Sequence, residues 1–419
     1  MSLAATNIRG AVARISVGGW FELYDLFMTA YISLGLIRAG LFSATSPSPF
    51  ALVGFASFIS CGFAGMFFGT LIFAGISDRF GRKAAFTYSL VWYSICTLVM
   101  AFMQSGPAID AWRFLAGIGI GVQLVTSDAY VSEIVPKEQR GRWIAFTQVI
   151  GYSAIPAAAL LAYLLVPHTF AGLDGWRLVA LIGSLGGVVI WFVRPGLPDS
   201  ARWQEARSQH KATGPIFTLK TIFDPTYRTR TLMLIIFNLL QAIGFYGFAS
   251  WVPIFLANQG VEFAHSLEYS FLIAIVNPLG PLLAMFFADR FQRKWQIVVL
   301  AIVVAAAGIA FAQVRTPGPI VICGIIVTLG LAWFSATYHS YQAELFPTRI
   351  RGQAVGFVYS WSRFSSIFVP FVIAAVLRAQ GTLGVFLLIG SAMLIVALDV
   401  AVLGPNTNGR DLDELSPLI

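Results

Sequence analysis

Two acidic residues, Glu22 and Asp25, stand three positions apart in the otherwise apolar segment GWFELYDLFMTAY, residues 19–31. This spacing places both side chains on one face of a helix. An ionised acid in the middle of a membrane helix costs about 2.5–3.5 kcal/mol, so such residues face a protein interior or a cavity. A low-dielectric environment favours the neutral form of a carboxylic acid, so such a pair is suited to taking up a proton near neutral pH.

Another charge in an apolar segment is Arg363, in YSWSRFSSIFVP, residues 359–370. No acid of the same half of the chain stands at matching depth, since Asp399 lies nearer the inner end of a different apolar segment. A guanidinium that faces a cavity offers a planar fork of donors to a carboxylate, so Arg363 is a candidate for binding an anionic substrate. The alternatives are a structural arginine that bonds main-chain carbonyl oxygens at a helix break, or a partner for Asp25.

The composition shows which elements must position these residues. The chain has 419 residues, of which 58% are hydrophobic and 11% charged, against about 25% charged in an average soluble domain. The mean hydropathy is +0.78. Apolar runs near 20 residues recur along the whole length, and each is long enough to cross the membrane as a helix. We therefore expect a polytopic all-α membrane protein, with no cleavable signal peptide and no disulfides among its three cysteines.

Twelve membrane spans are expected, and the positive charges orient them. With the N-terminus in the cytoplasm, 21 of the 27 lysines and arginines lie on the cytoplasmic side and four lie outside. This asymmetry predicts that both termini are cytoplasmic, and it explains the net charge of +8 without nucleic acid. The expected spans are roughly 15–37, 50–74, 84–104, 110–132, 143–166, 176–196, 230–256, 268–287, 295–313, 319–343, 352–377 and 382–403.

The chain divides into two related halves. The same shift of 211 residues carries DRFGRK (78–83) onto DRFQRK (289–294) and EIVPKEQRG (133–141) onto ELFPTRIRG (344–352). Equal shifts and an even number of spans indicate a parallel repeat. We expect two pseudo-symmetric six-helix bundles, with boundaries at 1–193 for the N-terminal bundle, 194–229 for a cytoplasmic loop, 230–404 for the C-terminal bundle and 405–419 for a cytoplasmic tail.

With these repeated loop motifs, the sequence resembles the major facilitator superfamily, and within it the sugar-porter and metabolite–proton symporter branch. GISDRFGRK resembles the superfamily's signature loop after the second helix. The branch is indicated by WRFLAGIGIG (112–121) with YVSEIVPKEQRGR (130–142), by LPDSARW (197–203) and by QAIGFYGFASWVPIF (241–255). The resemblance covers essentially the whole chain, and it implies the two-bundle fold and alternating access.

The seventh helix departs from the sugar-porter pattern. Gln241 and Gly244 are kept, but Leu240 and Tyr246 stand where sugar porters carry a glutamine and an asparagine. Those amides hold sugar hydroxyls in that branch. Their replacement disfavours a hexose as the substrate.

The resemblance assigns roles to the charges inside the membrane. Asp25 corresponds to the first-helix aspartate of proton-linked porters, which pairs with an arginine of the fourth helix, here Arg113. Protonation of Asp25 would release Arg113 and permit rocking of the halves, while Glu22 would extend the proton path or bind substrate amines. The alternative is a static ion pair, which adds little net stability. The pattern Arg351–Gly352, Arg363 and Pro370 resembles the eleventh helix of organic-anion and aromatic-acid carriers.

Further polar residues are candidates for the substrate site, although each is as well explained by a hydrogen bond between helices. They are Gln148, Tyr152, Asn238, Gln241, Asn277 and Tyr359, with Ser366 on the face of Arg363. His339 is a candidate proton shuttle, but a lone histidine is more often structural. Gly117, Gly119 and Gly121 are expected to permit close helix packing and not to form a phosphate loop.

Charged residues on the cytoplasmic side match the salt-bridge network that closes the inner face of the family's transporters. They are Asp78, Arg82, Glu133 and Arg142 in the first half, and Asp289, Arg293, Glu344 and Arg351 in the second. Such pairs would form in one conformation and break in the other. Positive-inside anchoring explains the same arginines equally well.

The function expected from these residues is secondary active transport, with protons as the coupling ion and no cofactor or metal. An enzyme is disfavoured because no HExxH, GxSxG or Walker motif is present. Proton-coupled symport of a small organic anion, an aromatic or hydroxy carboxylate, is favoured. The alternatives are sugar or polyol uptake, multidrug efflux, and exchange instead of symport. A monomer in a bacterial inner membrane is expected, with the lipid bilayer and a small-molecule carboxylate as partners.

Overall fold

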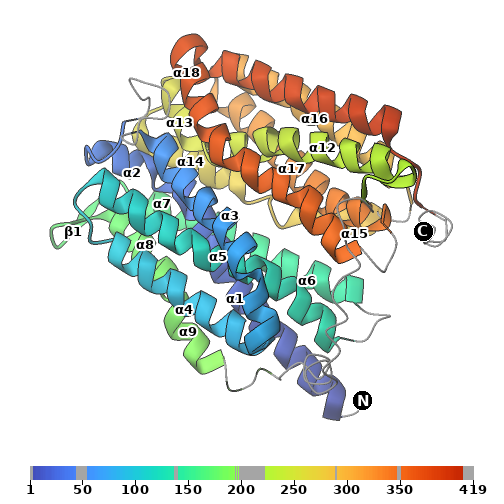
Figure 1. Ribbon diagram of the computed structural model, residues 1–419. Helices are drawn as coiled ribbons and strands as arrows, with labels where there is room; N and C mark the ends of the chain where they lie inside the picture. Colours follow the sequence, from blue (N-terminus) through green and yellow to red (C-terminus); the bar gives the residue numbers. More distant parts are fainter. Residues whose placement is uncertain are drawn as a thin grey trace. The chain divides into compact units, whose positions relative to one another are not determined.

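The fold is seen in a computed structural model (Figure 1), which describes residues 3–43, 54–135, 140–193, 195, 197, 222–287, 290–346 and 351–408. Within these ranges, the side chains of residues 3–7, 72–79, 125, 128–129, 132–133, 140–142 and 351–353 lie outside the description.

The described part is built almost wholly of helices. In chain order these are α1 (Leu3–Tyr31), α2 (Ser33–Arg38), α3 (Phe55–Phe80), α4 (Arg82–Met100), α5 (Gly106–Ile134), α6 (Arg140–Tyr152), α7 (Ala154–Leu165), α8 (Gly175–Ser184), α9 (Gly186–Val193), α12 (Pro225–Ala249), α13 (Val252–Asn258), α14 (Phe263–Ala274), α15 (Leu279–Phe287), α16 (Arg293–Gln313), α17 (Pro317–Glu344) and α18 (Arg351–Leu403). One short antiparallel hairpin joins β1 (Thr169–Phe170) to β2 (Leu173–Asp174), with Thr169 opposite Asp174.

The described helices are consistent with the twelve expected spans. Within the described residues, five of the expected spans consist of two consecutive helices, namely the pairs α1/α2, α6/α7, α8/α9, α12/α13 and α14/α15. The helix α18 has 53 residues, about 80 Å at 1.5 Å per residue, which is far more than a hydrocarbon core of about 30 Å. It contains two spans that meet at Gly381, whose φ of 66° suits glycine best.

Among the described residues, seven helical stretches are long and apolar enough to cross a membrane by themselves. Their bounds are Trp143–Leu165, Gly175–Val193, Pro225–Ala249, Phe263–Phe287, Arg293–Gln313, Pro317–Glu344 and Ala354–Leu403. The helices α1, α4 and α5 have 29, 19 and 29 residues but carry more polar side chains, among them Asp25, Thr97 and Arg113. The expected all-α membrane architecture is therefore confirmed, and its more polar helices are those that hold the first candidate site.

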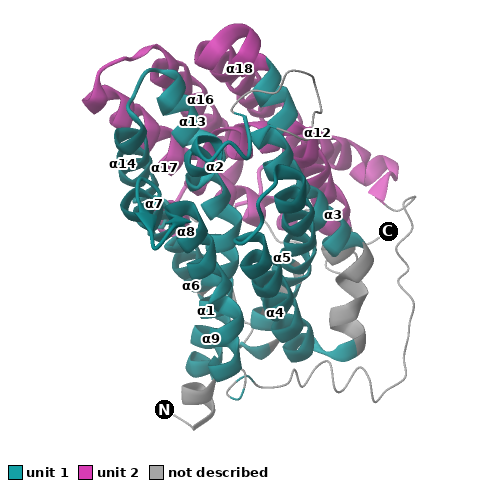
Figure 2. Cartoon of the chain, turned by 90° about the vertical axis from the view of Figure 1, so that its left-hand side faces the viewer, with its two compact units in different colours: residues 1–212, 250–278, 370–375 teal, residues 213–249, 279–369, 376–419 magenta. Residues whose placement is uncertain are grey.

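The chain forms two compact units (Figure 2). Unit 1 comprises residues 1–212, 250–278 and 370–375, and unit 2 comprises 213–249, 279–369 and 376–419. Unit 1 thus adds α13 and α14 to the first nine helices, while unit 2 holds α12, α15, α16, α17 and most of α18. These boundaries differ from the division at residues 193 and 230, and the six-plus-six division remains a prediction.

Glycines set the packing of unit 1. A Cβ atom on Gly65 of α3 would overlap the carbonyl oxygen of Phe114 on α5, and one on Gly117 would overlap that of Gly62. Gly121 meets α3 in the same way, whereas Gly119 faces α4 at Ser89 and Trp92. The expectation of close helix packing at Gly117, Gly119 and Gly121 is confirmed.

Candidate functional site

The first candidate site lies in unit 1 and is centred on Asp25 of α1. Its Oδ2 atom accepts a hydrogen bond of 2.5 Å from Nη1 of Arg113, on α5. Arg113 Nη2 also donates to the main-chain oxygen of Asp25 at 3.0 Å, and Thr97 of α4 donates to Oδ1 at 2.6 Å. Asp25 is fully buried and Arg113 is 2% exposed. The guanidinium therefore joins α1 to α5 through both the side chain and the main chain of one residue.

A glycine of α3 leaves space for the Arg113 side chain where α3 packs closely on α5. A Cβ atom on Gly62 would lie 3.1 Å from Nε of Arg113, so this glycine lets the arginine side chain pass between the helices. The ring of Phe58, one turn earlier on α3, lies 5.7 Å from the guanidinium carbon. Charge, small residues and an aromatic face together hold the arginine in one place.

Glu22 is buried on α1, one turn before Asp25. Between them Tyr24 donates a hydrogen bond to the carbonyl oxygen of Val179 on α8, at 3.1 Å. Gln148 and Tyr152 of α6 are half-buried in the same unit. The ion pair of this site is formed by Asp25 and Arg113.

Asn277 belongs to unit 1 and lies in the break between α14 and α15. Its amide nitrogen donates to the carbonyl oxygen of Ala274 at 2.8 Å, which caps the last turn of α14. The expected interruption at Pro278 is therefore present. The Asn277 amide therefore bonds a main-chain oxygen of its own helix, which agrees with a structural role for this residue.

The second candidate site lies in unit 2 and is centred on Arg363 of α18. Nη1 of Arg363 donates to the hydroxyl of Tyr246 on α12 at 2.8 Å, and Nη2 donates to that of Tyr359 at 2.9 Å. The guanidinium carbon lies 5.9 Å from the centre of the Tyr246 ring and 5.0 Å from that of Tyr359. Arg363 is 6% exposed. A buried guanidinium with phenol hydroxyls at its edge is a set of donors that suits a carboxylate.

A chain of polar contacts continues from Tyr359 into the core of unit 2. The ring of His339 on α17 lies 5.2 Å from the Tyr359 ring, and its Nδ1 atom is 3.2 Å from the amide nitrogen of Gln342. The Tyr338 hydroxyl lies 2.5 Å from Oε1 of Gln342 and 2.5 Å from Oδ1 of Asn238. A hydroxyl carries one hydrogen, so Tyr338 donates to one of these amides at a time.

Gln241 also belongs to this region. Its amide nitrogen donates to the hydroxyl of Ser362, the residue before Arg363, at 2.8 Å. Together with Tyr246 it ties α12 to α18 on either side of the arginine. Unit 2 therefore brings together four of the predicted residues, which are Asn238, Gln241, Tyr359 and Arg363.

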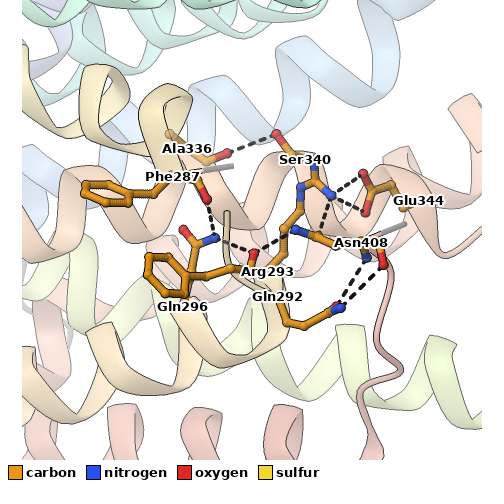
Figure 3. A network of polar contacts seen from close by, with 9 residues as sticks. Phe287, Gln292, Arg293, Gln296, Ala336, Ser340, Glu344 and Asn408 are labelled. Carbon is orange, nitrogen blue, oxygen red and sulfur yellow. Dashed lines mark hydrogen bonds and ion pairs between the residues drawn. The ribbon is translucent and has the colours of Figure 1, made fainter. Parts of the chain in front are cut away.

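The charged residues expected at a cytoplasmic gate are only partly described. Arg293 of α16 and Glu344 of α17 form an ion pair of 3.0 Å, and Arg293 also donates to Oδ1 of Asn408 at 2.7 Å (Figure 3). Both members of the pair belong to unit 2, so the pair joins helices within that unit. The backbone and side chain of Arg82 are described, whereas Asp289 and the side chains of Asp78, Glu133, Arg142 and Arg351 lie outside the described residues.

Four polar contacts were not anticipated from the sequence. Thr97, Tyr338, Gln342 and Ser362 carry no motif, and hydroxyl and amide residues in membrane helices are common, so no pattern separated them from packing residues. Tyr246 was noted only as a departure from the sugar-porter pattern. That departure could have indicated a contact with Arg363, because it places a phenol where sugar porters carry an amide.

Comparison with known proteins identifies the kind of chain that carries these sites. Residues 11–217 match the family model described as "Sugar (and other) transporter", and residues 269–414 match the model "Major Facilitator Superfamily". The Bacillus subtilis metabolite transport protein YyaJ, whose name specifies no substrate, is 30% identical over 94% of this chain and 91% of its own length.

Two further relatives have names that specify a substrate. The niacin transporter NiaP of Acinetobacter baylyi is 27% identical over 96% of this chain and 94% of its own length. The gentisate transporter of Corynebacterium glutamicum is 27% identical over 94% of this chain and 87% of its own length. Among solved structures, that of a D-xylose–proton symporter aligns with a TM-score of 0.78 at 19% identity, covering 96% of this chain and 99% of the symporter.

Proposed function

The chain belongs to the major facilitator superfamily, whose members are multi-pass membrane transporters, and on that premise we propose that it carries a small organic anion together with protons. The substrate class is an aromatic or hydroxy carboxylate. The supporting observation is the environment of Arg363. Its guanidinium is buried and donates hydrogen bonds to the phenol hydroxyls of Tyr246 and Tyr359. In this proposal the substrate carboxylate binds the guanidinium, and the tyrosine rings contact the body of the substrate.

The names of two relatives agree with this class of substrate. Niacin and gentisate are both aromatic rings that bear one carboxylate, and the transporters named for them align over nearly the whole chain. Uptake of a sugar is the second candidate. It is less well supported here because Leu240 and Tyr246 replace the amides expected of a sugar porter.

Proton coupling is assigned to Asp25 and Arg113. In its ionised form Asp25 accepts hydrogen bonds from Arg113 and Thr97, so the pair is neutral as a whole in a buried environment. Protonation of Asp25 removes the charge that holds Arg113, and the release of the guanidinium is the event that we link to alternating access. Glu22, one turn away, is proposed as a further carrier on the proton path. The coupling ion is the proton, and no cofactor takes part.

The remaining assignments follow the same proposal. The cytoplasmic gate comprises the predicted charged residues, of which Arg293 and Glu344 form an ion pair within unit 2. The membrane is proposed to be a bacterial inner membrane with both termini in the cytoplasm, because positive charges gather in the loops on that side. The protein is proposed to act as a monomer.

The test is uptake into proteoliposomes of labelled nicotinate, benzoate, gentisate and D-xylose, with and without an inward proton gradient. Arg363→Ala should lower carboxylate uptake by about thirtyfold or more, as expected when one partner of a buried charged contact is truncated. Asp25→Asn should abolish the response to the proton gradient. Arg378→Ala is the matched control, because Arg378 is an exposed arginine of the same helix α18.

Two outcomes would contradict the proposal. The first is uptake of D-xylose that Arg363→Ala does not change, with no uptake of any carboxylate. Arg363 would then have a structural role. Carboxylate uptake that keeps its response to the proton gradient in Asp25→Asn would remove Asp25 from the coupling site. In that case the same assay on Glu22→Gln would identify the carrier.

A further inference from the structure

Asp110 of α5 is an acid that neither the motifs nor the proposed sites account for. It is 5% exposed, and within the described part of the chain neither of its carboxylate oxygens has a hydrogen-bond partner. The Ser57 hydroxyl of α3 is the polar group beside this carboxyl group, and its hydrogen is directed to the carbonyl oxygen of Gly54 at 2.8 Å. Burial without a compensating charge disfavours the ionised form of a carboxyl group.

Arg113 follows Asp110 by one helical turn and has an unused donor. Its Nη1 and Nη2 atoms are held by Asp25, whereas Nε is buried and has no hydrogen-bond partner among the described residues. Residues three apart on a helix are neighbours on its surface. Long side chains in a helix point back toward its N-terminus, so Arg113 extends toward the turn that carries Asp110. Both side chains face the same stretch of α3, because Asp110 lies near Ser57 and Cys61 and the guanidinium carbon of Arg113 lies 5.7 Å from the centre of the Phe58 ring.

We propose that Asp110 is the alternative partner of Arg113 and the second proton-carrying carboxylate of unit 1. In the first of the two proposed states, Asp25 is ionised and bound to Arg113 as in the structure, while Asp110 holds a proton. In the alternative state Asp25 holds the proton, and Arg113 is bound to ionised Asp110. One proton is transferred from the Asp110 carboxyl group to the Asp25 carboxylate, and the guanidinium moves the opposite way, so charge and proton number are unchanged.

This exchange removes a difficulty of a one-carboxylate mechanism. If Asp25 were the sole acid, its protonation would leave the buried guanidinium of Arg113 without a counter-charge, which is strongly unfavourable. With Asp110 one turn away, Arg113 is compensated in both states. The titratable and polar groups around Asp25, Asp110 and Arg113 are Ser57 and Cys61 on α3, Tyr93, Cys96 and Thr97 on α4, and Glu22 on α1.

The first test measures stability and does not depend on the substrate. Thermal unfolding of the purified full chain is compared for Asp25→Asn, Asp110→Asn and the double variant. Each single variant leaves Arg113 one carboxylate, so the loss in the double variant should clearly exceed the sum of the single losses. Asp399→Asn, which alters a buried acid of unit 2, should combine additively with Asp25→Asn. Additive losses in the Asp25 and Asp110 cycle would overturn the proposal.

The second test concerns transport, and here the inference rests on the proposed proton-coupled function. Asp110→Asn should lower uptake driven by the proton gradient about tenfold, the size of a typical coupling between two sites, while exchange of labelled for unlabelled substrate persists. Asp110→Glu, which keeps a carboxylate on the same face, should restore gradient-driven uptake. Wild-type gradient-driven uptake in Asp110→Asn would overturn the proton-carrying role.

The two tests separate this inference from the proposed function. A non-additive stability cycle without uptake of any carboxylate would leave the exchange of partners standing and would sink the organic-anion assignment. Carboxylate uptake that depends on Arg363 and on the proton gradient, together with an additive cycle, would sink the role of Asp110 alone.

Discussion

The guanidinium of Arg363 donates a hydrogen bond to the hydroxyl of Tyr246 at 2.8 Å, although 117 positions separate the two residues in the chain. This contact joins α18 to α12 at the point where the sequence departs from the sugar-porter pattern. A phenol in this place satisfies one edge of the arginine and presents a ring beside it. The replacement of the sugar-porter asparagine by Tyr246 and the buried Arg363 therefore belong to the same contact between α12 and α18.

Tyr246→Phe should raise the KM for the transported carboxylate about two- to tenfold, because one hydrogen bond of about 0.5–1.5 kcal/mol is lost while the ring remains. The maximal rate should be nearly unchanged. The measurement is the concentration dependence of uptake in proteoliposomes. Tyr88→Phe, at an exposed tyrosine of α4, serves as the control. An unaltered KM would mean that the hydroxyl does not orient Arg363 for the substrate.

Thr97→Val should keep the volume of the side chain and remove its 2.6 Å hydrogen bond to Asp25. A hydrogen bond to a charged group contributes about 1.5–3 kcal/mol, so its loss should lower the midpoint of thermal unfolding of the purified full chain.

Thermal unfolding of this variant and of its control is measured in detergent. Thr126→Val is the matched control, because the buried Thr126 hydroxyl of α5 bonds only the carbonyl oxygen of Val122 in its own helix. Its unfolding midpoint should lie close to that of the wild type. An equally unchanged midpoint in Thr97→Val would mean that the Thr97 hydroxyl does not stabilise the pair of Asp25 and Arg113.

Gly65→Ala should destabilise unit 1, because its Cβ atom would overlap the carbonyl oxygen of Phe114 and push α3 away from α5. Overpacking of this kind costs about 1–3 kcal/mol. Thermal unfolding in detergent should show a lower midpoint. Gly19→Ala of α1 has no atom within 4 Å of the added Cβ, so it should leave the midpoint unchanged or raise it. Equal unfolding midpoints for Gly65→Ala and Gly19→Ala would show that α3 can shift away from α5 without loss of stability.

Asn408→Ala should loosen the segment that follows α18. The Asn408 side chain accepts a hydrogen bond from Arg293 (Figure 3). It donates one of 2.7 Å to the carbonyl oxygen of Phe291. Amide hydrogen exchange of residues 404–408 should become several-fold faster, since the loss of about 1 kcal/mol per hydrogen bond favours local opening.

The control for this segment is Asn406→Ala, because Asn406 is an exposed asparagine two positions earlier. It should leave the exchange rates close to those of the wild type. Equal rates in the two variants would indicate that the contacts of Asn408 do not hold the segment in place.

Local physical chemistry made much of this protein predictable. The apolar runs required a helical membrane protein, because a lipid environment leaves few ways to satisfy the backbone. The two related halves and the cytoplasmic termini stay predictions. The same reasoning singled out Asp25, Arg113 and Arg363, since a charge in an apolar run is costly and needs a partner or a function. The glycines at 117, 119 and 121 were also interpreted correctly, because small residues inside a span permit close packing.

Only the tertiary structure decided which polar groups meet. Thr97 and Tyr246 lie 72 and 117 positions from Asp25 and Arg363, and no local pattern relates residues so far apart. The structure also showed that Asp110 is buried without a hydrogen-bond partner in the described part, although it stands three positions from Arg113. The sequence determined that these helices must bury charges, because a polar group in an apolar run has no water to solvate it. Which partner compensates each charge depends on how the helices pack, and that is a property of the folded chain.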